Sequence, residues 1–177
     1  MNNNQQYDEL LDIVDENDRV IGQKYRSEVR QQRLSNFRLI NVFLMNEKKE
    51  LWIPRRAPHK KLFPLCLGSS VGGHVTSGES YDQAFEREVR EELNLELADL
   101  DYKFVTKLTP QQHNISAYMH IYIVNTNVSP KYNKDDFVEA SWMTITDLQA
   151  KIKNGERTNE DLPILINILQ HYFHTSG

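Results

Sequence analysis

The sequence predicts an α/β protein in which helices cover a mixed β-sheet. Short runs rich in β-branched and aromatic residues recur along the chain, as expected of strands. Segments with apolar residues at helical spacing lie between and after these runs. Pairs of strand-like runs are joined by short polar turns, which is typical of antiparallel hairpins.

The size and charge of the chain are those of an ordinary globular protein. It has 177 residues, of which 39% are hydrophobic and 26% are charged, so we expect one domain over residues 1–177 with a flexible tail at 1–8. The formal charge of −4 gives no support for nucleic-acid binding. A polar N-terminus, the lack of a long apolar run and a single cysteine predict a cytoplasmic protein that does not bind membranes.

The first part of the chain predicts two hairpins with a short helix between them. Residues 10–25, LLDIVDENDRVIGQKY, contain two apolar runs around a polar turn. The polar residues 26–34 are expected to form the short helix. Strands over 37–46 and 50–56 are joined by the turn candidate NEKK. Two prolines then break the chain into an irregular segment.

The best-defined helix is predicted to start at Ser80. Ser80 and Gln83 fit the capping-box pattern, in which each side chain bonds to the backbone of the other residue. Asn94 is a suitable stop, because Asn tolerates the left-handed backbone at a helix end. The apolar stripe of this helix consists of Tyr81, Ala84, Phe85, Val89 and Leu93.

The remaining chain predicts further strands and two helices. Strands are expected at 100–108, 115–125 and 137–144, followed by a helix near 145–153. The segment DLPILINILQHYFH, residues 161–174, reads as an amphipathic helix that packs on the sheet.

The helix after Ser80 carries an unusual group of carboxylates. Glu88, Glu91 and Glu92 are spaced so that they share one helical face, where like charges repel one another. A solvated surface would tolerate this arrangement. A divalent cation would offset the repulsion much better, since Mg²⁺ prefers oxygen ligands. The carboxylates alone leave both interpretations open.

The spacing around this helix decides in favour of the metal site. From Gly73 through Glu79 and REVREE at 87–92 to Leu95, residues 73–95 resemble the Nudix box. The resemblance implies the Nudix fold, an α/β/α sandwich with a mixed sheet, in which a loop–helix–loop holds Mg²⁺ and cleaves a diphosphate linkage. Mn²⁺ is expected to substitute for Mg²⁺. Asn94 replaces the family's late glycine, at a cost below about 1 kcal/mol.

The resemblance also assigns roles. The expected metal ligands are the Gly73 carbonyl and the carboxylates of Glu88, Glu91 and Glu92. Arg87 is expected to orient a glutamate through a bidentate pair and so completes the catalytic group. Glu79 would hold the loop or an outer water. Glu139 is either an additional carboxylate of the site or a surface residue.

The segments upstream of the box resemble isopentenyl-diphosphate isomerase and a branch of isomerase-like Nudix hydrolases, over roughly residues 10–150. The isomerase cysteine is matched by Gly72, its metal histidine by Phe37, and its remaining carboxylates fall near Ile115 and Ala117. Cys66 is expected to serve packing. His74 matches an isomerase histidine, and we expect it to be a loop or substrate-side residue. The chain lacks these isomerase residues and keeps the glutamates of the Nudix box, which favours hydrolysis over isomerisation.

Basic residues before the box are candidates for binding the substrate's phosphates. The candidates are Arg38, Arg55, Arg56, Lys60 and Lys61. A solvated basic loop is the alternative. The substrate class stays open between nucleoside di- or triphosphates, nucleotide sugars and small diphosphates such as prenyl diphosphates. A catalytically silent domain that binds a nucleotide-like ligand is the alternative function, and isomerase activity is less favoured. A homodimer is common among relatives.

Overall fold

The computed structural model describes residues 8–175. Most of the expected N-terminal tail, residues 1–7, lies outside them. The helices and strands are, in chain order, β1 (Leu10–Val14), β2 (Val20–Tyr25), α1 (Arg26–Gln31), β3 (Arg38–Met45), β4 (Leu51–Arg56), β5 (Val71–His74), α2 (Tyr81–Leu93), the 3-10 helix η1 (Leu97–Asp99), β6 (Asp101–Leu108), α3 (Pro110–His113), β7 (Tyr118–Asn125), β8 (Phe137–Met143), α4 (Ile145–Lys153) and α5 (Leu162–Thr175).

The main sheet is mixed and has six strands. Its order is β6-β7-β3-β4-β8, with β5 also paired to β3. The β3–β7 pair is parallel and the other pairs are antiparallel. Two strands therefore pair with the same edge of β3: β5 pairs with Leu39–Val42, and β4 pairs with the last residue, Met45. β5, which leads into α2, therefore lies beside β3 and contacts that helix.

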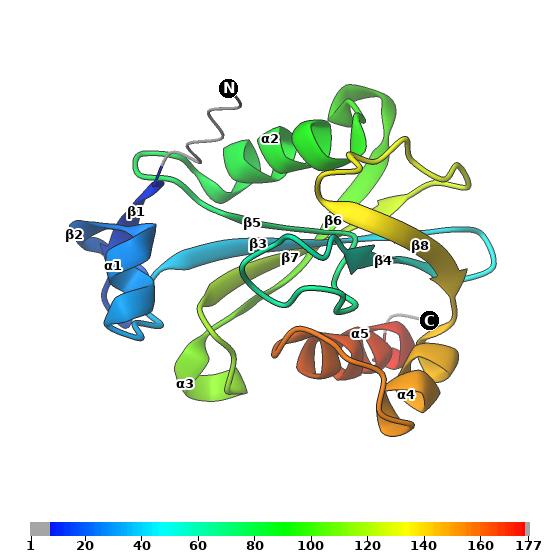
Figure 1. The fold of residues 1–177 in the computed structure, drawn as a ribbon. Coiled ribbons are helices and arrows are strands. Elements are labelled where there is room, and N and C mark those ends of the chain that lie inside the picture. Colours follow the sequence, from blue (N-terminus) through cyan, green and yellow to red (C-terminus); the bar gives the residue numbers. More distant parts are fainter. Residues whose placement is uncertain (1–7, 176–177) are drawn as a thin grey trace.

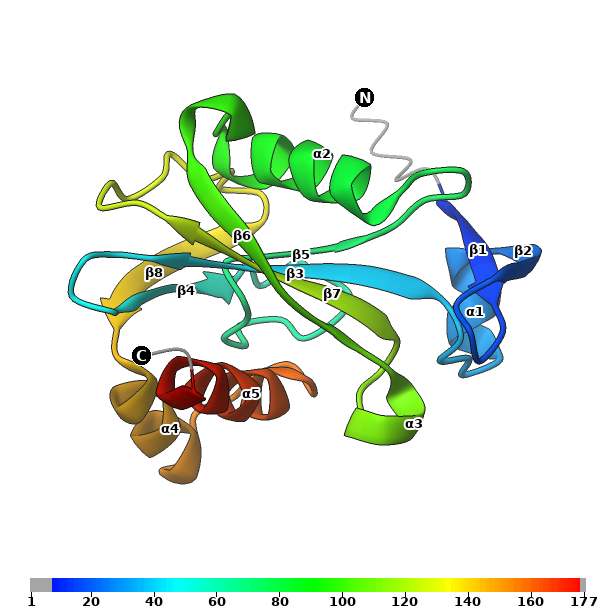
Figure 2. The ribbon, with the colours of Figure 1, turned by 180° about the vertical axis from the view of Figure 1, so that it is seen from behind.

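Helices cover both faces of the sheet. α2 lies across one face, and α4 and α5 lie on the other (Figures 1 and 2). Successive residues of β4 alternate between these two layers. Trp52 is buried in the core beneath α2, and Ile53 is buried in the core beneath α5. The predicted α/β/α sandwich with a mixed sheet is confirmed.

The β1–β2 hairpin and α1 form a separate element at one end of the sheet (Figure 1). Leu11, Ile13 and Val29 bury a small core with Phe37 and Ala117. β2 is exposed at almost every position. The apolar contact between the hairpin and the rest of the molecule therefore comes from β1.

Two predicted boundaries need correction. The helix expected over 26–34 ends at Gln31, because Arg33 takes a left-handed backbone (φ 52°) and the Leu34 N–H bonds back to Val29. The strand expected from 115 begins at Tyr118. Ser116 instead donates its N–H and its hydroxyl to Asp161, at 2.9 and 2.6 Å, and so ties the chain to the start of α5.

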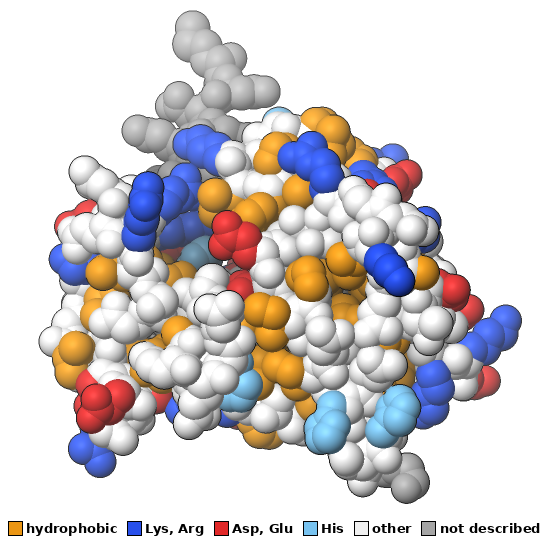
Figure 3. Space-filling model, turned by 90° about the horizontal axis from the view of Figure 1, so that it is seen from below, with side chains coloured by type: hydrophobic (Ala, Val, Ile, Leu, Met, Phe, Trp, Pro, Cys, Tyr) orange, Lys and Arg blue, Asp and Glu red, His pale blue; other side chains and the backbone are white. Residues whose placement is uncertain are grey.

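The helical layer opposite α2 is seen from below in Figure 3, where histidines lie among scattered hydrophobic side chains. A groove of 480 Å³ runs between β6, α3 and α5 and is lined in part by His113, His171 and Ile168. It lies on the face of the sheet away from the acidic helix. No helix within residues 8–175 is both long enough and apolar enough to cross a membrane.

Candidate active site

The acidic helix begins where the capping pattern predicts. The Ser80 N–H donates to Gln83 Oε1 at 2.8 Å, and the Gln83 N–H donates to Ser80 Oγ at 3.2 Å. Ala84, Phe85, Val89 and Leu93 are buried against the sheet. This burial fixes the rotation of α2 about its axis, and the rotation decides where each glutamate points.

The three glutamates of the cluster have different surroundings. Glu88 is only 7% exposed, whereas the side chain of Glu91 is 58% exposed. Glu92 buries its Oε2 atom, which has no hydrogen-bond partner among the described residues. An ionised carboxylate oxygen without a partner is costly to bury. Among the described residues, the buried Glu92 Oε2 atom therefore lacks a cation or a hydrogen-bond donor that would stabilise its charge.

Gly73 lies directly against Glu88. A Cβ atom built on Gly73 would be 2.1 Å from Glu88 Cδ and 2.2 Å from its Oε1. Only glycine leaves room for the carboxylate at this point of β5. The expected carbonyl ligand and the expected carboxylate ligand are thus brought together by the pairing of β5 with β3 and by the contact of β5 with α2.

Arg87 connects the loop before α2 with the carboxylates on it. Its Nε and Nη2 atoms donate to the two carboxylate oxygens of Glu79, both at 2.9 Å. Its Nη1 donates to Glu88 Oε1 at 2.7 Å, and its Nη2 also donates to the His74 carbonyl at 2.9 Å. The bidentate partner of Arg87 is therefore Glu79, while its contact with Glu88 is single.

Glu79 holds the loop, as one of its two expected roles requires. Its Oε2 accepts the N–H of Thr76 at 3.1 Å and the Thr76 hydroxyl at 3.0 Å. Burial raises the pKa of Glu79, but the hydrogen bonds from Arg87 and Thr76 outweigh it, so that the pKa lies below its usual value. Glu79 is ionised and fixed beside Arg87.

The inner glutamates hold protons more strongly than usual. Burial raises the pKa of Glu88 to about 7; Arg87 opposes this shift, and the negative charges of Glu91 and Glu9 add to it. Burial also raises the pKa of Glu92, with the charges of Glu88 and Asp136 acting in the same direction. Both shifts result first from burial, and the neighbouring negative charges add to them.

Two cations, one at the end of β4 and one in the loop that follows, act on Glu92. The positive charges of Arg56 and Lys60 lower the pKa of Glu92, so both residues lie within electrostatic reach of its carboxylate. Lys60 forms an ion pair with Asp136. Lys61 is exposed. Asp136 was missed by the sequence reasoning, because no local pattern marks a residue that reaches the site from a distant loop.

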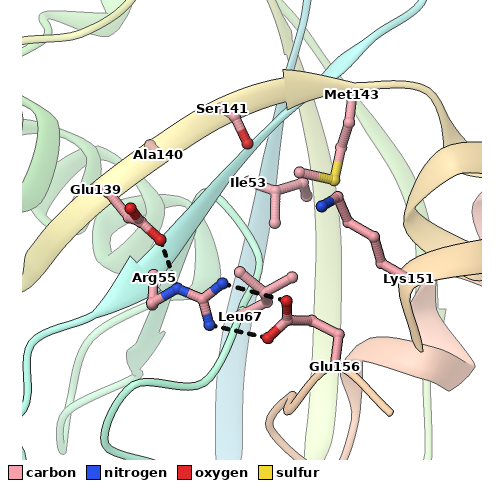
Figure 4. A pocket seen from close by; sticks show the side chains of 9 residues that line it. All are labelled: Ile53, Arg55, Leu67, Glu139, Ala140, Ser141, Met143, Lys151 and Glu156. Carbon is pink, nitrogen blue, oxygen red and sulfur yellow. Dashed lines mark hydrogen bonds and ion pairs between the residues drawn. The ribbon is translucent and has the colours of Figure 1, made fainter. Parts of the chain in front are cut away.

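Among the described residues, Arg55 and Glu139 pair with each other and not with the glutamates of α2. Arg55 Nε donates to Glu139 at 2.6 Å, and its Nη1 donates to Glu156 at 2.9 Å (Figure 4). These three residues line a pocket of 160 Å³ on the face of the sheet that bears α4. The reason is strand alternation: Arg55 and Arg56 are neighbours in β4 and must point to opposite faces.

Arg38 pairs with a carboxylate of the β1–β2 turn. Its Nε donates to Asp18 at 2.7 Å, and its guanidinium lies 5.5 Å from the centre of the Tyr81 ring. Asp18 further accepts from Lys107 at 2.7 Å and from the Tyr81 hydroxyl at 3.1 Å. Arg38 therefore anchors the turn of the β1–β2 hairpin.

The positions that match the isomerase metal site are apolar here. The ring of Phe37 stacks on His74 at 5.7 Å, and Phe37 shares its small core with Ala117. Ile115 is buried in the larger core beneath α5. Burial and three nearby arginines lower the pKa of His74 to about 3, so the ring is neutral. Cys66 is buried, in agreement with a packing role.

Asn94 takes the backbone conformation that the family's glycine would take. Its φ and ψ are 55° and 41°, in the left-handed region. Its side-chain amide donates to the Lys131 carbonyl at 2.6 Å, and the Glu92 carbonyl accepts the Asn133 N–H at 2.8 Å. The substitution therefore keeps the helix end and connects it to the loop that carries Asp136.

The donor set fits a hard divalent cation. Carboxylate oxygens are the ligands that Mg²⁺ prefers, and the orphaned Glu92 Oε2 and the crowded Glu88 would each gain a partner from such an ion. Within residues 8–175, no three Asp, Glu, His or Cys side chains are already close enough together to form a metal cage. The fit lies in chemistry and burial rather than in a preformed cage.

The fold and the acidic loop–helix–loop define a member of a family of diphosphate-cleaving hydrolases. The family model described as the NUDIX domain matches residues 36–162. The chain belongs to the NUDIX family.

Similar proteins agree with this classification. An uncharacterized Nudix hydrolase of a Nostoc species is 46% identical over 160 residues, which span 90% of this chain and 95% of the relative. A crystal structure of a Deinococcus radiodurans protein is 41% identical, covers 90% of this chain and 98% of its own, and has a TM-score of 0.86. Isopentenyl-diphosphate Delta-isomerase 1 of Photorhabdus laumondii is more distant, at 26% identity over 81% of this chain and 84% of its own.

Proposed function

We propose that this protein is a Mg²⁺-dependent hydrolase that cleaves the diphosphate linkage of a nucleotide-like or other small diphosphate. The observation that carries the proposal is the buried, unpartnered Oε2 of Glu92, beside Glu88 and opposite the cations Arg56 and Lys60. A site that combines carboxylates for a metal with cations for phosphates suits a substrate with concentrated negative charge. We further propose that the hairpin and the NUDIX core form one domain.

The residues have separate tasks in this proposal. Glu88, Glu91, Glu92 and the Gly73 carbonyl would hold the metal, for which Mn²⁺ can substitute. When bound, the metal would neutralise phosphate charge and acidify the attacking water. Arg87 keeps Glu88 in place through its contact at 2.7 Å. Arg56 and Lys60 would hold the phosphate oxygens, with the exposed Lys61 as a further contact.

The reaction consumes one water. The water oxygen forms a bond to phosphorus, and the bond from phosphorus to the bridging oxygen breaks. The proton lost by the water passes to a carboxylate of the glutamate cluster, which acts as the general base. Arg56 and Lys60 would stabilise the charge that develops on the leaving phosphate.

The test is the release of the cleavage products from a panel of nucleoside di- and triphosphates, nucleotide sugars and prenyl diphosphates with Mg²⁺. Wild-type protein is compared with Glu92→Gln, and Glu86→Gln is the matched control because Glu86 is exposed on the same helix. We expect the first variant to lose at least about 100-fold in rate and the control to match wild type. Equal turnover by Glu92→Gln and wild type would refute the assignment. Tight ligand binding without turnover would indicate a silent binding domain.

A further inference from the structure

Strand β1 lies beside the loop that leads into the acidic helix. Leu11 forms a β-bridge with Thr76, and the Ser77 N–H donates to the Leu10 carbonyl at 2.8 Å. β1 precedes the region matched by the NUDIX model, residues 36–162. The hairpin therefore adds contacts to the loop that the matched core does not provide by itself.

Asp12, at the centre of β1, makes the polar part of this contact. Its side chain is buried, with the residue only 6% exposed. Its Oδ1 accepts the Ser77 hydroxyl at 2.7 Å, and its Oδ2 accepts the Gly78 N–H at 3.2 Å. Gln23 from β2 donates to the same carboxylate at 3.4 Å and also to the Ser77 hydroxyl oxygen. Asp12 thus binds both residues of a turn.

The turn is the point where the loop changes direction toward α2. Gly78 has a φ of 82°, in the region that favours glycine. The next residue is Glu79, which binds Arg87 with both carboxylate oxygens. Arg87 in turn binds Glu88 at 2.7 Å. A continuous series of contacts therefore runs from the hairpin to a carboxylate of the proposed metal site.

We propose that Asp12 is a positioning residue for this site: by fixing the Ser77–Gly78 turn, it holds Glu79 and Arg87 where they orient Glu88. The inference rests on the proposed function, since it assigns Asp12 a role in the same metal site. Groups that orient ligands from outside a metal site change its affinity without touching the ion.

The experiment measures Mn²⁺ affinity by titration without substrate, together with hydrogen exchange of the Gly78 amide. Asp12→Asn keeps the size of the side chain but replaces one acceptor oxygen with a donor. The matched control is Asp15→Asn, because Asp15 accepts hydrogen bonds only within the hairpin turn, from Asn17 and Arg19. All measurements are made well below the unfolding midpoint of each variant.

We expect Asp12→Asn to bind Mn²⁺ about tenfold more weakly and to exchange the Gly78 amide faster. Asp15→Asn should match wild type in both measurements. Lower stability of Asp12→Asn with unchanged affinity and exchange would mean a purely structural role and would overturn the inference.

A second variant covers the case in which Asp12→Asn does not fold. Ser77→Ala removes one donor to Asp12 and leaves no buried charge unpaired. An affinity about threefold weaker supports the inference, and an unchanged affinity overturns it. If wild type binds Mn²⁺ but hydrolyses no diphosphate, the proposed activity fails while this comparison still decides the role of Asp12. If wild type binds no Mn²⁺, both proposals fail.

Discussion

The backbone of Gly73 lies so close to the carboxylate of Glu88 that no side chain fits between them. A Cβ atom added at position 73 would lie 2.1 Å from Glu88 Cδ. The contact joins β5 to α2 at the centre of the candidate site. It also makes position 73 a sensitive point for mutation.

Gly73→Ala should displace the Glu88 side chain or push α2 away from the sheet. We expect a loss of about 1–3 kcal/mol in the free energy of unfolding, as for other overpacked sites, and a large loss of Mn²⁺ affinity. Urea denaturation and metal titration measure the two effects. Gly22→Ala is the control, because a Cβ at Gly22 meets nothing within 4 Å. A Gly73→Ala protein as stable and as active as wild type would contradict the described contact.

Arg55 and Arg56 should differ sharply when each is replaced with alanine. Arg56→Ala removes a cation near Glu92, so we expect KM for a diphosphate substrate to rise about tenfold or more. Arg55→Ala leaves Glu139 and Glu156 without their partner. It should lower the free energy of unfolding by about 1 kcal/mol, with little change in KM. The reverse outcome would show that Arg55 is the substrate-side residue.

Glu92→Gln should stabilise the metal-free protein at neutral pH while it abolishes activity. The folded-state pKa of Glu92 is raised by burial and by Glu88, so folding is opposed by its ionisation once the pH exceeds the unfolded value near 4.3. Thermal unfolding in a chelator should show a higher midpoint for the variant at about pH 7.5, with the difference vanishing near about pH 4. Adding Mg²⁺ should raise the midpoint of wild type more than that of the variant.

Asn94→Ala should cost about 1–2 kcal/mol of stability, because alanine is strained in the left-handed region and cannot bond to the Lys131 carbonyl. Asn94→Gly keeps the backbone conformation and loses only the side-chain bond, so its cost should be smaller. Urea denaturation of both variants separates the two contributions. An equal cost for both would mean that the left-handed backbone contributes no strain.

The contribution of His120 to stability should fall as the pH is lowered, because between about pH 6.5 and about pH 4 this residue takes up a proton only in the unfolded chain. Burial and the nearby Lys107 charge lower the pKa of His120 to about 4, against about 6.5 unfolded. Its contribution is complete above about pH 6.5 and is lost progressively down to about pH 4.

His120→Phe should remove about 1 kcal/mol of this pH dependence, after allowance for solvent screening of a partly exposed group. His59→Phe, a change at an exposed position, is the control. Unfolding curves at several pH values give the free energy of unfolding as a function of pH. The same pH dependence in wild type and in His120→Phe would refute the prediction.

Local patterns in the sequence predicted the acidic helix and its ends well. Ser80 and Gln83 act within the first turn of the helix, so their roles depend on neighbouring residues alone, whereas Asn94 also bonds to the distant Lys131 carbonyl. β5 was not predicted, because its two glycines have low strand propensity and only its pairing with β3 makes it a strand.

Local sequence patterns could not predict the polar contacts between residues that are far apart in the chain. Asp12 lies 65 residues from Ser77 in the chain, and Asp136 lies 76 residues from Lys60. Strand alternation implied that Arg55 and Arg56 face opposite sides, but the face that carries the site depends on which helix covers it. That information resides in the packing of α2 and α5 on the sheet.

The bulge between β4 and β8 falls at these two arginines, with Arg55 opposite Glu139 and Arg56 opposite Phe137. A deletion or insertion of one residue in β4 would turn the strand over and exchange the two guanidinium groups. Arg56, which we propose binds phosphate, would then lie near Glu156. Arg55 would lie on the side of Glu92. Insertions and deletions in β4 should therefore be tolerated in evolution only when they comprise two residues. A single-residue change should be tolerated only when a second bulge restores the original alternation of side chains.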